Sequence, residues 1–187
     1  MNIFWIATLT LASLASAKAQ DVPPLAPLRG DAASLPDTMK FIEDKVTGKV
    51  NYIVYWHDNI TGTDSPPAKL TFEISNVSAD AGRCQIRYHV RFDDGKKITE
   101  NDFGVPLKMV REITFIQMDV LAQRNLAKAG HPERSAKIDP AISVVMAKLD
   151  TAHQMVFAFY DDTLADRVSK ALQHAADLCG GGNKDPF

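Results

Sequence analysis

The segment from residue 58 to residue 64 carries side chains that could hold a metal ion. Oxygen atoms of Asp58, Asn59 and Asp64 could gather around calcium, a cation that takes oxygen ligands. The segment lacks the ligand spacing and the terminal glutamate of an EF-hand loop. Asn, Asp, Gly and Thr are also the residues that a turn between two strands requires. Two interpretations therefore stay open, a calcium site and an ordinary turn, and we favour the turn and expect no bound metal.

A second group of charged side chains follows one predicted strand. Arg87, His89 and Arg91 alternate with apolar residues, so they share one face of that strand. Such a row could bind an anionic ligand or the carboxylates of a partner protein. A solvated sheet face explains the same pattern, and the sequence does not separate the two.

Recognised catalytic motifs are absent from the sequence. It contains no G-x-S-x-G nucleophile elbow and no phosphate-binding glycine loop that opens a helix. The five histidines, at positions 57, 89, 131, 153 and 174, show no H-E-x-x-H spacing. We therefore expect no cofactor. An enzyme would have to use residues that only folding brings together, such as His57, Asp58 and His89.

Cys84 and Cys179 are the only cysteines in the chain. An even number of cysteines in an exported chain predicts a disulfide, because oxidising compartments let such a pair persist. Two buried free thiols are the alternative, since cysteine is among the most buried residue types. Their wide separation and the lack of a C-x-x-C motif disfavour a metal site.

The first 19 residues predict export from the cytoplasm. Residues 3–15 form an apolar run that is shorter than the roughly 20 residues a membrane span needs. Ala17-Lys18-Ala19 follows and matches the small-x-small pattern of signal peptidase sites, which predicts cleavage after Ala19. No Lys or Arg precedes the run, so an uncleaved buried helix is the alternative. We expect a periplasmic or extracellular protein without a membrane span.

Composition and charge indicate one globular domain after a short leader. The formal net charge of −2 argues against nucleic-acid binding, which calls for a basic excess. Residues 20–33 are rich in Pro and Ala and predict a flexible linker. Residues 34–182 are long enough for one core, and residues 183–187 predict a loose tail.

Hydrophobic periodicity divides residues 34–182 into strands between two helices. A stripe that begins after the potential cap Ser34 predicts a short helix ending at Gly48. A second stripe, from Leu164 to Leu178, predicts a C-terminal helix. Mixed charge with Gly130 and Pro132 predicts a long exposed hairpin loop over 121–138. The seven predicted strands are 50–56, 70–74, 84–92, 97–101, 112–118, 141–149 and 155–160.

Several short phrases carry a resemblance to known proteins. Phe159-Tyr160-Asp161, followed by Ala165, Arg167, Val168 and Ala171, resembles the last strand and helix of pleckstrin-homology-like domains. A wider set is similar to small exported bacterial proteins of unknown function: His57-Asp58-Asn59, Thr61-Gly62, Cys84 with Ile86 and Tyr88, and His174-Ala175 with Leu178 to Gly182.

The resemblance implies an α+β fold, a bent antiparallel sandwich or barrel of about seven strands with a C-terminal capping helix. A bridge from Cys84 to Cys179 would then join that helix to the sheet. Members of the superfold that bind phosphoinositides carry Lys and Arg after the first strand, where this chain has Asp58 and Asp64. The resemblance therefore does not imply lipid signalling.

Two hypotheses about function follow. The first is an exported, non-catalytic binding domain that accepts a peptide or protein partner, in a groove beside the terminal helix or along a strand edge. The second is an exported hydrolytic or metal-dependent enzyme. The sequence predicts no oligomeric state.

Overall fold

The computed structural model describes residues 33–150 and 154–182. The predicted signal peptide, residues 20–32 of the predicted linker and the tail from residue 183 lie outside the described residues. The described part contains three helices: α1 (Leu35–Val46), α2 (Met118–Lys128) and α3 (Asp162–Leu178). Its nine strands are β1 (Gly48–Asp58), β2 (Thr63–Asp64), β3 (Ala68–Asp80), β4 (Gln85–Asp93), β5 (Ile98–Pro106), β6 (Val110–Gln117), β7 (Arg134–Asp139), β8 (Ser143–Leu149) and β9 (Gln154–Phe159).

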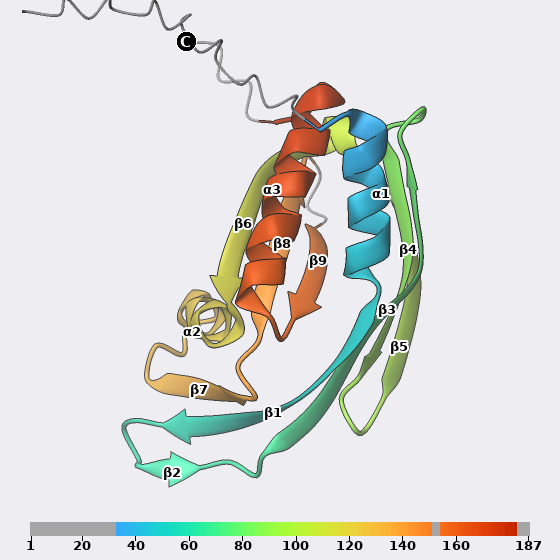
Figure 1. The fold of residues 1–187 in the computed structure, drawn as a ribbon. Helices are drawn as coiled ribbons and strands as arrows, with labels where there is room; N and C mark the ends of the chain where they lie inside the picture. The colour runs from blue at the N-terminus through green and yellow to red at the C-terminus, as the bar shows by residue number, and fades with distance from the viewer. Residues whose placement is uncertain (1–32, 151–153, 183–187) are drawn as a thin grey trace, which may run out of the picture. The chain divides into compact units, whose positions relative to one another are not determined.

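The first sheet is built on the antiparallel series β1, β3, β4 and β5 (Figure 1). Two parts of the second half of β1, residues 53–54 and 57–58, are paired on both edges. Val54 is opposite Ala68 of β3 on one edge and Ile138 of β7 on the other. The short strand β2 returns along the end of β1, on the same edge as β3. No free edge of β1 therefore remains from residue 53 to residue 54.

The second sheet, β6-β8-β9, lies between two hydrophobic cores. Along β8, Val145 and Ala147 face one core, and Val144 and Met146 face the other. Alternating side chains of a strand point to opposite faces, so both faces of β8 are apolar. The run Ser143–Leu149 is accordingly almost continuously buried.

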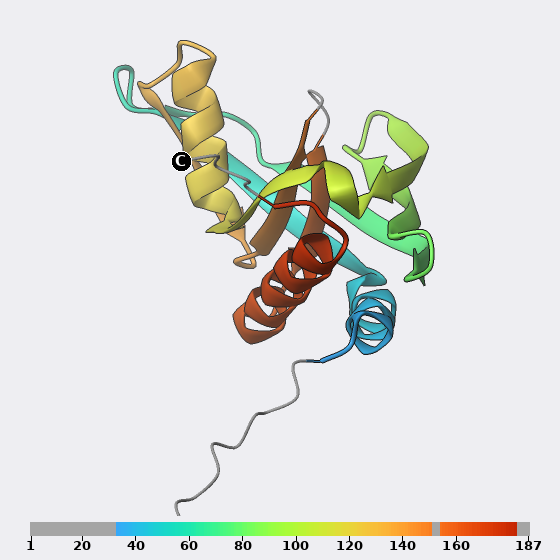
Figure 2. The same ribbon diagram turned by 90° about the horizontal axis from the view of Figure 1, so that it is seen from above.

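Helices α1 and α3 lie side by side and cover the first core (Figures 1 and 2). The helix α1 is capped by Ser34, whose hydroxyl accepts the Asp37 amide hydrogen, as the sequence predicted. The helix α3 is capped by Asp161, whose carboxylate accepts the amide hydrogens of Thr163 and Leu164 at 2.8 and 3.1 Å. Both caps satisfy amide groups that have no partner within the helix.

The predicted α+β class and the predominance of antiparallel strands agree with the structure, but several details differ from the prediction. Nine strands are present in the described residues instead of about seven, and the two sheets do not close into a barrel. The turn after β1 contains the short strand β2. Residues 121–138, predicted as a loop, form most of α2 and all of β7, because β7 pairs with the far edge of β1.

The structure joins Cys84 and Cys179 in a disulfide with an S–S distance of 2.11 Å. Cys84 lies in the turn before β4 with φ of +51°, so it precedes the strand that it was predicted to open. Cys179 immediately follows α3. The bridge therefore links the end of the C-terminal helix to the first sheet. None of the helices in the described residues is long and apolar enough to span a membrane.

Candidate functional site

The predicted calcium ligands are used by the turn that contains them. One carboxylate oxygen of Asp58 accepts the amide hydrogens of Ile60 and Thr61, both at 3.0 Å. The Thr61 amide in particular holds the pKa of Asp58 below its ordinary value. Asp64 contacts His57, with 2.8 Å between Nδ1 and Oδ1. The backbone amide nitrogen of Asn59 donates to the backbone carbonyl oxygen of Glu133 at 2.9 Å.

No three His, Cys, Asp or Glu side chains converge in a metal-binding arrangement within residues 33–150 and 154–182. Turn formation alone accounts for the residue types of the 58–64 segment. The segment therefore positions the end of β1.

The basic row on β4 lies on one sheet face, as predicted, and acidic side chains of β5 accompany it. His89 Nδ1 lies 2.9 Å from an Asp102 carboxylate oxygen, and Arg91 Nε lies 3.4 Å from Glu100. Arg87 is opposite Gly104 and donates to the Gln85 side chain at 3.1 Å. Carboxylates therefore accompany two of the three members of the row, and they leave this face little unpaired positive charge for an anion.

His57 and His89 are not brought together. His89 is paired with Ser75 of β3, and the residue before Ser75 is paired with the first residue of β1. His89 therefore lies level with the start of β1. His57 lies near the other end of that strand. The candidate catalytic set His57, Asp58 and His89 is therefore divided between two regions of the sheet.

A more distinctive feature is the apolar stripe of α2. Its apolar members recur with helical spacing, and they are Met118, Leu121, Ala122 and Leu126. Asn125 and, just after the last residue of α2, Ala129 complete the stripe. All six side chains line a single hollow above the first sheet. None of the residues from Met118 to Lys128 is fully buried. An amphipathic helix normally buries this stripe, so α2 leaves apolar surface accessible.

The floor of the hollow is apolar as well. Tyr52, Val54 and Trp56 alternate along β1 and point to the same face, and Leu70 of β3 and Ile138 of β7 flank them. The cavity between this floor and α2 has a volume of about 330 Å³. We call it the Trp56 groove, defined by these five floor residues and the six residues of the α2 stripe.

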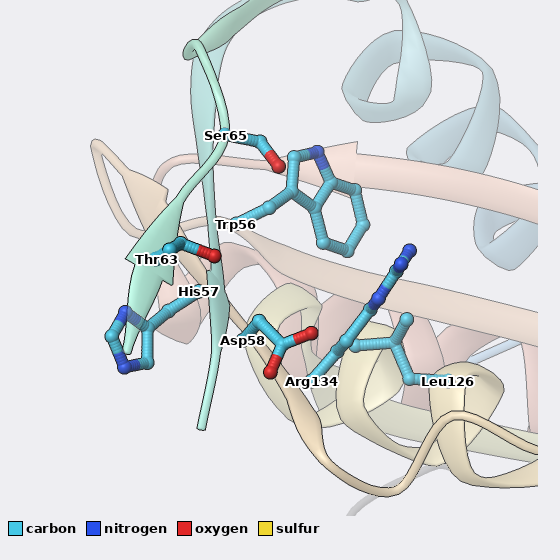
Figure 3. A pocket seen from close by; sticks show the side chains of 7 residues that line it. All are labelled: Trp56, His57, Asp58, Thr63, Ser65, Leu126 and Arg134. Carbon is cyan, nitrogen blue, oxygen red and sulfur yellow. The ribbon is translucent and has the colours of Figure 1, made fainter. Parts of the chain in front are cut away.

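Polar side chains gather at one end of the Trp56 groove (Figure 3). Trp56 and Leu126 line both the groove and a second hollow of about 310 Å³. We call this second hollow the polar mouth. Its lining residues are Trp56, His57, Asp58, Thr63, Ser65, Leu126 and Arg134.

Arg134 is the main cationic group of the polar mouth. It is the cross-strand partner of Asp58, and its charge contributes to the lowered pKa of that carboxyl. Among the described residues, Arg134 forms no ion pair with a carboxylate. Figure 3 shows its side chain on the same side of the sheet as the Trp56 ring. The guanidinium is thus placed to meet an anionic group at the polar mouth.

The polar mouth does not assemble a nucleophile with a base. Figure 3 shows the His57 imidazole on the opposite side of the sheet from the Trp56 ring and Arg134. His57 is half-buried against Asp64 and away from the Ser65 hydroxyl. The geometry suits holding a molecule with an apolar body and a polar end better than attacking one.

The sequence interpretation missed the Trp56 groove because it treated residues 121–138 as a loop. Its floor could be anticipated, since Tyr52, Val54 and Trp56 alternate in a predicted strand. The helical spacing from Met118 to Ala129 was the available signal for the other wall. The charges of Arg124 and Lys128 and the nearby Gly130 and Pro132 obscured it.

Comparisons of the chain with models of protein families, with curated proteins and with solved structures found no match.

Proposed function

We propose that this chain is an exported, non-catalytic binding domain whose ligand occupies the Trp56 groove. The observation that carries the proposal is the accessible apolar stripe of α2, which faces an equally apolar floor across a cavity of about 330 Å³. Ligand pockets typically enclose about 300–1,000 Å³ and are lined mainly by apolar side chains with a few polar groups. The Trp56 groove and its polar mouth fit that description.

We also propose that the domain has a pleckstrin-homology-like fold. The series β1, β3, β4 and β5, a second sheet of three strands and a C-terminal helix support this assignment. In this view, α2 and β7 form an insertion between β6 and β8. The insertion supplies one wall of the proposed site, and a superfold by itself does not define a ligand.

The groove predicted beside the terminal helix is not the favoured location. The centre of the apolar face of α3 is buried in the first core, through Ala165, Val168, Leu172 and Ala175. The accessible apolar surface belongs to α2 instead. We therefore place the binding site at the other side of the second sheet, over the second core.

Export is the part of the proposal that rests on residues 1–19 and on the disulfide. The expected mature protein begins at Gln20, outside the cytoplasm. Cell fractionation and N-terminal sequencing test this directly. Recovery of the chain in the cytoplasm with Met1 to Ala19 intact would contradict it.

Binding can be followed through Trp56 in the full chain carrying Trp5→Phe, because Trp5 and Trp56 are the only tryptophans. We expect the apolar dye 1-anilinonaphthalene-8-sulfonate to bind at one saturable site and to change the emission of Trp56. Ala122→Phe fills the groove and is expected to weaken dye binding at least about tenfold. Ala127→Phe makes the same change at an exposed position of α2, and dye affinity should stay within about twofold.

Two outcomes would overturn the proposal. One is a folded Ala122→Phe protein that binds the dye with unchanged affinity. The other is turnover in a broad hydrolase screen that disappears in His57→Ala, because that result would establish catalysis. Circular dichroism and a thermal melt of each variant separate loss of binding from loss of folding.

A further inference from the structure

We propose that the Trp56 groove binds an alkyl carboxylate, with the hydrocarbon chain under α2 and the carboxylate at Arg134. This inference rests on the proposed binding function of the groove and assigns its ligand class. It follows from three features, which are the composition of the groove walls, the pairing of the strands below them and the charges of the polar mouth.

The residues that line the Trp56 groove favour a ligand whose main part is apolar. Asn125 is the only lining residue of the groove that is neither aliphatic, thioether nor aromatic. Moving a polar group into such surroundings without a hydrogen-bond partner is unfavourable, whereas a methylene group is stabilised there by about 0.8 kcal/mol. A hydrocarbon chain therefore matches the groove along its whole length.

The strands below the groove disfavour a peptide. Peptides that add to a sheet need a free strand edge. In the floor, Val54 is already paired with Ala68 and with Ile138, so among the described strands only the outer edge of β7 could accept one beside the groove. The main chain of a peptide in the groove would lose hydrogen bonds to water without replacing them. Each such unsatisfied group is unfavourable by about 1–3 kcal/mol. A hydrocarbon chain carries no such groups.

The polar mouth selects the head group. Arg134 presents a planar fork of N–H donors that matches a carboxylate, and no carboxylate in the described residues pairs with it. The hydroxyl groups of Thr63 and Ser65 line the same hollow (Figure 3). The nearby negative charge of Asp58 disfavours a doubly charged phosphate monoester, so a single carboxylate fits best.

The two hollows can hold the two ends of one molecule. Trp56 and Leu126 line both of them, so the groove and the polar mouth meet at these side chains. A carboxylate at Arg134 directs an attached chain past the Trp56 ring toward Leu121 and Met118. The ligand would cover the apolar stripe of α2 that the protein itself leaves accessible.

The test uses the full chain with Trp5→Phe, and decanoate and decanol are titrated below their aggregation concentrations at neutral pH. Affinity is measured by Trp56 emission and by calorimetry. We expect decanoate to bind more tightly than decanol or decyl phosphate. Arg134→Gln is expected to weaken decanoate binding about tenfold and to leave decanol binding within about twofold.

Two further variants sharpen the test. Lys137→Gln removes one positive charge from the opposite face of β7, where Lys137 is paired with Tyr55, and decanoate affinity should stay unchanged. Asp58→Asn keeps a carbonyl oxygen for the turn but removes the negative charge. It is expected to tighten decanoate binding by a few-fold.

The outcomes separate this inference from the proposed function. Equal affinity for decanol and decanoate, with no effect of Arg134→Gln, would overturn the carboxylate assignment and leave the groove as a binding site. Tighter binding of decyl phosphate would do the same. Displacement of the dye by an amidated apolar tripeptide, but not by decanoate, would replace the ligand class with a peptide. Binding of no probe at all would overturn both proposals.

Discussion

The Tyr160 hydroxyl group pairs with both backbone polar groups of Asn51. The Asn51 amide nitrogen donates to the phenolic oxygen at 2.6 Å, and the hydroxyl donates to the Asn51 carbonyl oxygen at 2.9 Å. Asn51 lies in β1 just before the segment that β7 covers, so this stretch of the edge has no neighbouring strand. Tyr160 follows β9. The contact therefore joins the second sheet to the free part of the β1 edge.

We expect Tyr160→Phe to lower the free energy of unfolding by about 1 kcal/mol. The effect is modest because water can replace the hydroxyl group at this exposed position. Tyr55→Phe is the matched control, since the side chain of Tyr55 is exposed like that of Tyr160. Denaturant unfolding at neutral pH measures both. Equal midpoints for the two variants would show that the contact does not stabilise the fold.

The disulfide is expected to stabilise the folded state strongly. Its cysteines are 95 residues apart, and closing so long a loop corresponds to about 3–5 kcal/mol in the chain-entropy model. The double variant Cys84→Ser, Cys179→Ser should lose about that much free energy of unfolding. Thiol titration of the unreduced, denatured protein should find no free thiol. Two reactive thiols, with stability unchanged by reduction, would contradict a structural role of the bridge.

Gly181 is expected to tolerate no side chain. A Cβ atom there would lie 2.3 Å from the Leu107 carbonyl oxygen and 3.1 Å from the Val110 carbonyl oxygen. These are backbone atoms, which cannot move aside as a flexible side chain can. Gly181→Ala should therefore lower the free energy of unfolding by about 1–3 kcal/mol. Gly48→Ala is the control, because its Cβ would meet no atom within 4 Å. Thermal melts should separate the two variants clearly.

Asp150 is expected to make stability depend on pH. Hydrogen bonds from Arg111, one of them 2.6 Å from Nη2 to Oδ2, hold the pKa of Asp150 below the ordinary value of 3.8. A carboxyl group with a lowered folded-state pKa stabilises the fold above pH 3.8, and that contribution is lost as the pH falls through the lowered pKa.

Asp150→Asn should therefore reduce the denaturant midpoint at pH 6. At a pH low enough to protonate Asp150 in the folded state, the midpoints of the variant and of the unsubstituted chain should become equal. Arg111→Gln should show the same convergence, because it removes the partner. A constant difference between Asp150→Asn and the unsubstituted chain at every pH would exclude the ion pair as its cause.

Hydrophobic periodicity and a helix cap predicted the helices and strands that bury one face and expose the other. The Ser34 cap and the stripe that follows it identify α1, and the stripe from Leu164 identifies α3. Strict alternation from Ile86 onward identifies β4. In each case the pattern is strong because one face contacts the core and the other contacts water.

The region from Met118 to Asp139 carried only a weak signal of this kind. The helix α2 has no fully buried residue, and its short apolar stripe includes the polar residue Asn125. The strand β7 forms only because the far edge of β1 is available to pair with it. A contact between segments so distant in sequence leaves little trace in either segment alone.

The candidate site shows the same division. The residues singled out first, Asp58, Asn59 and Asp64, have a local explanation in their own turn. Asp58 also lies at the polar mouth, but only because folding places Arg134 opposite it. The residue types alone indicated a possible site at this position, but they did not indicate whether it would bind a metal ion or another ligand.

The sequence by itself determined the order of most strands, the two flanking helices and the availability of one cysteine pair, because these follow from local periodicity and composition. Only the tertiary structure decided the Trp56 groove. Its walls come from β1, β3, α2 and β7, and its volume depends on how far α2 lies above the sheet. That distance results from long-range strand pairing and packing, which no single segment of the chain encodes.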